Sequence, residues 1–138
     1  MVINMLKTFA FAMTATGLAV FSTTASAGEY QSSVMLPAVF AKNYDYTAYL
    51  PVKGSPPSNV NISNVTWNWS VVGWPDQFSV RLCAGTASNC IDVSRQRSSS
   101  TNSFFAHNPN KQFFYILRAG TNTLVPVGGQ EGKITVQW

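Results

Sequence analysis

Residues 77–96, QFSVRLCAGTASNCIDVSRQ, decide the fold that we expect for this chain. Apolar and polar side chains alternate along residues 78–83 and again along residues 90–93, which is the period of a β-strand. The segment between these two runs, AGTASN, contains only small or turn-forming residues and favours a loop. The stretch therefore predicts a β-hairpin, with Cys83 and Cys90 at facing ends of its strands and within disulfide range.

The first residues of the chain have the pattern of a secretory signal peptide. Lys7 supplies a positive charge, and residues 8–21 form an apolar run that is too short to span a bilayer. The run is followed by Ala-Ser-Ala at 25–27, the small-x-small pattern of a signal-peptidase site. We therefore expect export, cleavage after Ala27 and a single mature domain of residues 28–138. No later apolar run has membrane length, so no membrane span is expected in the mature chain.

The two cysteines of the hairpin are the only cysteines in the sequence. An exported protein folds in an oxidising compartment, where Cys83 and Cys90 should be joined. A zinc site would need four ligands, and the chain offers one histidine, His107, and no other cysteine. A redox pair more often has two residues between its sulfurs than the six found here. We therefore expect a structural disulfide.

The rest of the mature chain reads as short strands separated by Gly, Pro, Asn and Ser. The strongest alternation runs from residue 65 to 72 and places Trp67 and Trp69 on one face with two valines, as core aromatics. Further strands are expected at 30–36, 44–50, 113–118, 124–127 and 133–138, with turns at 119–122 and 128–132 and a loop or mobile edge at 98–103. About eight or nine short strands in one domain predict an all-β, antiparallel β-sandwich.

Charge and ionisable groups argue against catalysis and against nucleic-acid binding. Without the signal peptide the chain has a net charge of +3, and Arg95 and Arg97 are its only close basic pair. A nucleic-acid-binding protein would favour a basic stripe or a known motif, and the sequence has neither. The carboxylates show no spacing that singles out an acid–base pair, and His107 lies in a turn-like Ala-His-Asn-Pro segment. We expect a binding protein without catalytic residues, metal or cofactor.

The sequence does not decide whether Trp74 belongs to the core. It lies in a Gly-Trp-Pro-Asp turn at residues 73–76, where side chains often reach solvent. The ring could contact a ligand or partner, or it could cap the end of the core. Trp74, Arg95 and Arg97 are accordingly the candidate partner-binding residues.

The pattern of the central strands resembles the family of the flagellar protein FlhE. The resemblance rests on WNWSVVG at 67–73, VRLC at 80–83, CIDV at 90–93 with Gln96, and a similar tail at 113–115, Gly120, 124–127 and 134–136. It implies a β-sandwich similar to that of pilus chaperones and a periplasmic accessory protein of flagellar export and assembly. It further implies protein partners among flagellar or envelope components, and no catalytic residues.

Two other functions remain open at this point. A secreted carbohydrate- or cell-wall-binding module could use Trp74 to stack on sugar rings, and a small inhibitor of a periplasmic or host enzyme is a further alternative. A chaperone of this fold would offer an unpaired strand edge to its client, and we expect the 133–138 strand to provide one. The sequence does not identify a client or an oligomeric state.

Overall fold

The computed structural model describes residues 27–138, so the expected signal peptide lies outside the described residues except for its last position, Ala27. The described residues contain strands and connecting loops but no α-helix. The strands are β1 (Glu29–Met35), β2 (Asp45–Tyr49), β3 (Asn64–Val71), β4 (Phe78–Ala84), β5 (Cys90–Asp92), β6 (Ser98–Thr101), β7 (Phe113–Ala119) and β8 (Gly129–Gln137).

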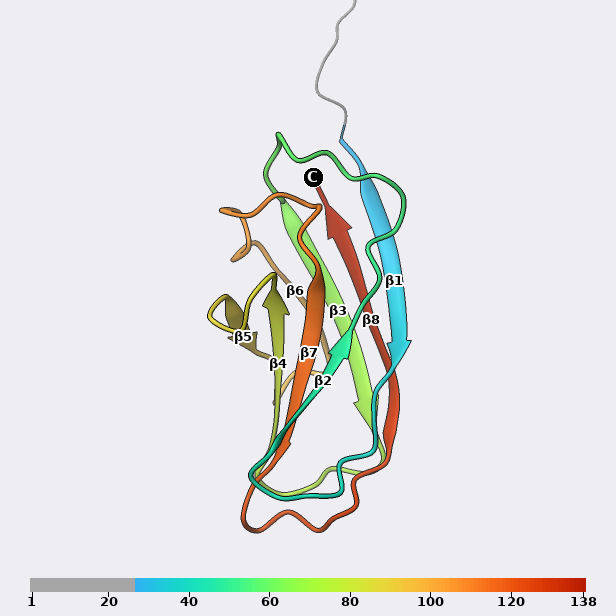
Figure 1. The fold of residues 1–138 in the computed structure, drawn as a ribbon, viewed down its shortest axis with the longest axis vertical. Coiled ribbons are helices and arrows are strands. Elements are labelled where there is room, and N and C mark those ends of the chain that lie inside the picture. The colour runs from blue at the N-terminus through green and yellow to red at the C-terminus, as the bar shows by residue number, and fades with distance from the viewer. Residues whose placement is uncertain (1–26) are drawn as a thin grey trace, which may run out of the picture.

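The eight strands form two four-stranded sheets that pack face to face (Figure 1). The strand order is β1-β8-β3-β6 in one sheet and β2-β7-β4-β5 in the other, and every pair is antiparallel. This confirms the predicted β-sandwich. The expectation that residues 133–138 offer an exposed edge is wrong, because β8 lies between β1 and β3 and is paired on both sides. The edges are formed by β1, β6, β2 and β5.

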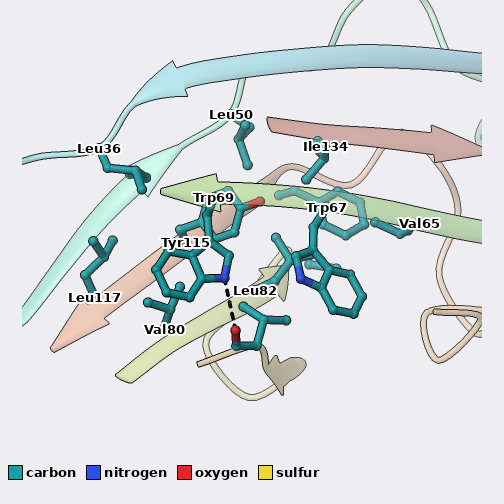
Figure 2. Packing of buried hydrophobic residues seen from close by; sticks show 14 of the residues in the cluster. Leu36, Leu50, Val65, Trp67, Trp69, Val80, Leu82, Tyr115, Leu117 and Ile134 are labelled. Atoms are coloured by element: carbon teal, nitrogen blue, oxygen red, sulfur yellow. Dashed lines mark hydrogen bonds between the residues drawn. The ribbon is translucent and has the colours of Figure 1, made fainter. Parts of the chain in front are cut away.

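The core lies between the sheets and is centred on β3, whose inward-facing residues are all buried (Figure 2). The two indoles are also hydrogen-bonded. Trp67 Nε1 donates to the carbonyl of Gln96 at 2.8 Å, and Trp69 Nε1 donates to the carbonyl of Val93 at 3.0 Å. Because buried N–H groups are costly to leave without a partner, the tryptophans fix the course of the 93–97 connection between β5 and β6.

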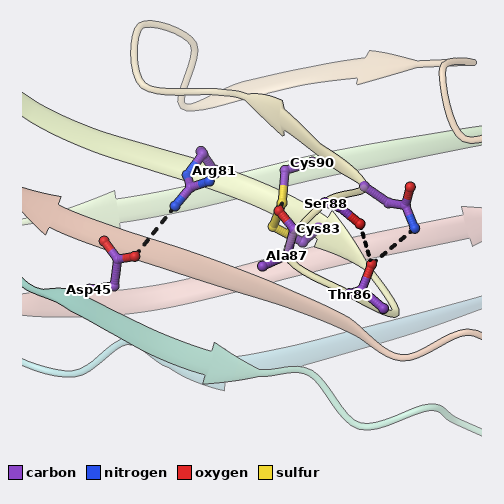
Figure 3. The surroundings of a disulfide bond; sticks show 8 residues. Asp45, Arg81, Cys83, Thr86, Ala87, Ser88 and Cys90 are labelled. Carbon is purple, nitrogen blue, oxygen red and sulfur yellow. Dashed lines mark hydrogen bonds and ion pairs between the residues drawn. A yellow bond between two sulfur atoms is a disulfide. The ribbon is translucent and has the colours of Figure 1, made fainter.

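The β4–β5 hairpin forms as the sequence predicts. Cys83 and Cys90 are directly paired in its register and joined by a disulfide, with their Cα atoms 4.0 Å apart (Figure 3). Cys83 is buried beside Phe114 and Ile116 of β7, in a small cluster separate from the main core. The disulfide therefore anchors the short strand β5 to the sheet.

Three segments differ from the sequence-based expectation. Residues 98–101 form strand β6, the expected strand at 124–127 is a loop with one isolated bridge from Val127 to Val39, and the expected turn at 128–132 is mostly the beginning of β8. The glycines that suggested this turn are required by close packing. A Cβ atom on Gly132 would lie 2.9 Å from side-chain atoms of Leu36 and of Tyr115, so only glycine fits without displacing them.

Candidate binding surface

Trp74 stands on the turn between β3 and β4, and 73% of its surface is exposed. The preceding residue, Gly73, has φ of 70°, a left-handed conformation that glycine adopts without strain. The guanidinium carbon of Arg97 lies 3.6 Å from the centroid of the Trp74 ring, which is the geometry of a cation–π contact. One face of the exposed indole is therefore covered by an arginine, and the ring is held away from the core.

Arg97 is itself firmly held at the start of β6. Its carbonyl accepts the backbone N–H of Trp69 at 2.8 Å, and its guanidinium donates to the carbonyls of Val71, at 3.2 Å, and of Gly73. The guanidinium also lies 4.9 Å from the Trp69 ring. Burial lowers the pKa of Arg97 from its usual value. Arg97 therefore fixes the position of the Trp74 ring. Arg95, in contrast, is exposed.

A groove of about 560 Å³ opens beside Trp74, and Arg95 lies on its wall. The groove is lined by Trp74, Pro75, Asp76, Gln77, Phe78, Ser79, Asp92, Ser94 and Arg95. The structure therefore brings Trp74 and Arg95 to one site, although they lie far apart in the sequence. The aromatic wall and the charged groups could together orient a ligand that has both apolar and polar parts.

Asp92 is a fixed anion in this groove. Its carboxylate accepts hydrogen bonds from the Ser94 hydroxyl at 2.5 Å and from the Ser94 backbone N–H at 2.9 Å. These two bonds hold the pKa of Asp92 below its ordinary value, with smaller contributions from the charges of Arg95 and Arg81. The sequence analysis did not single out this pair, but the Asp-x-Ser spacing is the usual signal of such a turn.

The open edge of β6 meets the Trp74 site. Trp69 N–H bonds to Arg97 O, so alternation along an antiparallel ladder turns the backbone groups of Ser98 and Ser100 away from β3. Both serines are exposed, and β6 contains neither proline nor a charged side chain that would block pairing. The sequence predicted a loop or a mobile edge for residues 98–103 and did not decide between them, because four small polar residues carry no strand signal of their own.

The single histidine of the chain lies away from this surface. His107 lies in the connection between β6 and β7, and its carbonyl accepts the N–H of Ile62. This connection and the β3–β4 turn, which carries Trp74, lie at opposite ends of the sandwich (Figure 1). The largest pKa shifts belong to Tyr30 and Tyr115, whose pKa values are raised by burial in the core and not by a neighbouring charge. Within residues 27–138 no group of three His, Cys, Asp or Glu side chains is placed to hold a metal ion. The same residues include no helix long and apolar enough to cross a membrane.

Neither the models of known families nor the curated proteins include a match to this chain. Among solved structures, the crystal structure of FlhE superposes with a TM-score of 0.70 at 20% sequence identity, over 83% of this chain and 98% of that chain. The crystal structure of the serine protease of Aeromonas sobria superposes with a TM-score of 0.64 at 9% identity, over 85% of this chain. The match spans 28% of the protease chain, and the structure of the same protease in complex with its chaperone ORF2 gives the same values. These similarities show that the chain has an FlhE-like fold.

Proposed function

We propose that this protein is a periplasmic accessory protein of flagellar export and assembly, which binds a protein partner and catalyses no reaction. The FlhE-like fold supports this proposal, because the similarity extends over 98% of the FlhE chain. The Cys83–Cys90 disulfide supports an oxidising compartment such as the periplasm. The flagellar context, the periplasmic location and the absence of catalysis were also expected from the sequence resemblance.

The open edge of β6, which ends at the Trp74–Arg97 stack, is the observation that carries the binding role. An extended segment of a partner can pair with the outward backbone groups of Ser98 and Ser100 and so add a strand to the sheet. The same segment would then reach Trp74, an exposed aromatic held by Arg97, which has the properties of an interface anchor. Main-chain pairing would supply affinity, and the groove beside Trp74 would supply selectivity for the side chains of the partner.

The test is complementation of a strain from which this gene is deleted, measured as swimming in soft agar and as flagella per cell. Ser100→Pro removes an outward N–H of β6, and Trp74→Ala removes the anchor, so neither variant should restore swimming. Ser33→Pro is the matched control, because Ser33 lies at an outward-facing position of β1, the other edge of the same sheet. It should restore swimming, as should His107→Ala.

Normal flagella and swimming in the deletion strain would overturn the flagellar proposal. If that strain swims normally and the purified protein binds peptidoglycan through Trp74, the carbohydrate-binding alternative replaces it. Restoration of swimming by Ser100→Pro to the wild-type level would remove the β6 edge from the mechanism while leaving the flagellar role intact. Thermal melts of each variant establish that loss of swimming does not reflect loss of folding.

A further inference from the structure

The exposed large apolar side chains of the described residues are concentrated at one end of the sandwich. Six of the eight lie on the last residue of β1 or in the loops 36–44, 72–77 and 120–128, which meet at the lower end of the molecule in Figure 1. They are Met35, Phe40, Tyr44, Val72, Trp74 and Leu124. We call this surface the apolar end. Leu124 is 86% exposed, more than any other large apolar side chain described.

Backbone hydrogen bonds hold the three loops side by side. Val39 and Val127 exchange two bonds of 2.9 Å, which join the first loop to the third. The N–H of Val72 donates to Gly128 at 2.9 Å, and the Gln77 side chain accepts the N–H of Asn122 at 2.9 Å, which joins the second loop to the third. The apolar side chains are therefore presented outward by an ordered base.

The apolar end is almost free of charge, and the strands next to it are positive. Its three loops contain only two charged residues, Lys42 and Asp76. Just above them, Arg81 and Arg118 share the single carboxylate of Asp45, at 3.5 Å and 3.0 Å. Asp92 of β5 is the register partner of Arg81 in the same sheet, and the two arginines at 95 and 97 follow it in the connection to β6. Glu131, the register partner of Met35, forms an ion pair with Lys133 at 3.5 Å. With this pair included, the end and its surroundings carry six cations and four carboxylates, a net charge of +2.

We propose that the apolar end docks onto the surface of an anionic lipid bilayer. Loop tips that carry Phe, Tyr, Trp and Leu can enter the boundary between headgroups and acyl chains, where Trp and Tyr are especially favoured. Arginines around the inserted tips can then contact lipid phosphates, and each such cation adds to the attraction. This is peripheral binding to one leaflet, which requires no membrane-spanning segment.

The shape of the surface favours a bilayer over a protein as the occupant. Phe40, Tyr44 and Leu124 are 68%, 63% and 86% exposed, so these side chains project into solvent. The three grooves found in residues 27–138 are lined by other residues. Insertion into lipid needs no complementary shape, whereas a specific protein interface does. Docking by the apolar end would leave the edge of β6 accessible, because the strands run along the long axis of the sandwich (Figure 1). This proposal does not depend on the flagellar role.

Co-sedimentation of the purified mature protein with vesicles tests the proposal directly. The protein should bind vesicles of phosphatidylethanolamine and phosphatidylglycerol, bind vesicles of phosphatidylcholine more weakly, and lose affinity as salt is added. The double variant Phe40→Glu/Leu124→Glu should bind about tenfold or more weakly, because each side chain would otherwise bury its apolar surface in the bilayer. The matched control is Phe105→Glu, since Phe105 is 65% exposed, against 68% for Phe40, and lies at the other end of the molecule. It should bind as the wild type does.

Two results would overturn the proposal. One is a wild-type protein that does not sediment with either kind of vesicle. The other is equal weakening by Phe105→Glu and by the double variant, which would indicate non-specific adsorption. If a thermal melt shows that the double variant is unfolded, Leu124→Glu alone decides the question in the same way. Ser100→Pro should still bind vesicles, which separates membrane docking from pairing at the β6 edge. If the wild-type protein does not sediment with vesicles and the double variant does not restore swimming, the apolar end binds a protein instead.

Discussion

Replacement of Trp69 by phenylalanine should strongly destabilise the domain, whereas the same replacement at Trp74 should not. Trp69 is buried, and its Nε1–H donates to the carbonyl of Val93 at 3.0 Å. Phenylalanine loses this buried hydrogen bond, which contributes about 1–1.5 kcal/mol. It also leaves a cavity where the larger ring of the indole was, which costs about 1–1.5 kcal/mol more. Trp69→Phe should therefore lower the free energy of unfolding by about 2–3 kcal/mol.

The expected cost at Trp74 is much smaller. Its ring is 73% exposed and its main contact is the Arg97 guanidinium, so even Trp74→Ala should cost only about 0.5–1 kcal/mol. Phenylalanine would keep an aromatic face under the guanidinium and should cost less. In a domain of this size, the Trp69 variant should melt about 10 °C or more below the wild type, and the Trp74 variants within a few degrees of it.

Thermal and urea unfolding of the oxidised protein, followed by far-ultraviolet circular dichroism, measures these differences. Trp67→Phe is an internal control, because Trp67 is also buried and also donates its indole N–H to a backbone carbonyl. Equal destabilisation by Trp69→Phe and Trp74→Phe would refute the reasoning. It would mean that the buried indole of Trp69 and its hydrogen bond contribute no more to stability than the exposed ring of Trp74.

Three further predictions concern the disulfide and two acidic groups. Replacing Cys83 and Cys90 by alanine opens a loop with a sequence separation of 7, so urea unfolding should show a loss of about 2.5 kcal/mol. Mass spectrometry of the native protein should find no free thiol. Burial raises the pKa of Tyr30 from 10.0 to about 12, so the folded state holds this proton more tightly than the unfolded state. Stability should thus fall as the pH rises through this interval, and less steeply in Tyr30→Phe. The Ser94 hydrogen bonds lower the pKa of Asp92, a contribution to stability that is lost as the pH falls through the folded-state pKa. Ser94→Ala should raise that pKa in a carboxyl NMR titration, and an unchanged value would contradict the assignment.

The parts of the fold that could be predicted from the sequence are those with a strong local period. β3 alternates without interruption, and the hairpin of β4 and β5 has two alternating runs around a loop of small residues. Strand β6 was predicted only as a loop or a mobile edge, because its four small polar residues become a strand only through pairing with β3. The glycines of β8 were misleading for a related reason. Gly132 is required by the nearness of Leu36 and Tyr115, which local sequence does not show.

The binding surface could be predicted in its members but not in its arrangement. The turn around Trp74 indicated that its ring could be exposed to a partner and need not cap the core. The charges of Arg95 and Arg97 indicated a charged border of a binding surface. The contact between Trp74 and Arg97 depends on Trp67 and Trp69, which fix the course of the connection that carries the arginine. The two hydrogen bonds that hold this connection join residues more than 20 positions apart in the sequence. Local periodicity does not predict contacts between residues so far apart.

The pairing of β1 with β8 has a consequence for the time at which the domain can fold. Glu29 and Gln137 are partners in this ladder although 108 positions separate them, and β8 is the one described strand beside β1. On the proposed route of export, a chain that crosses the membrane as an extended polymer cannot complete this sheet until residue 137 has emerged. Contacts of such long range make folding slow, whereas the β4–β5 hairpin needs only neighbouring residues. On the proposed route, the disulfide can therefore close before the sandwich forms, whereas β1 stays unpaired until the end of the chain arrives.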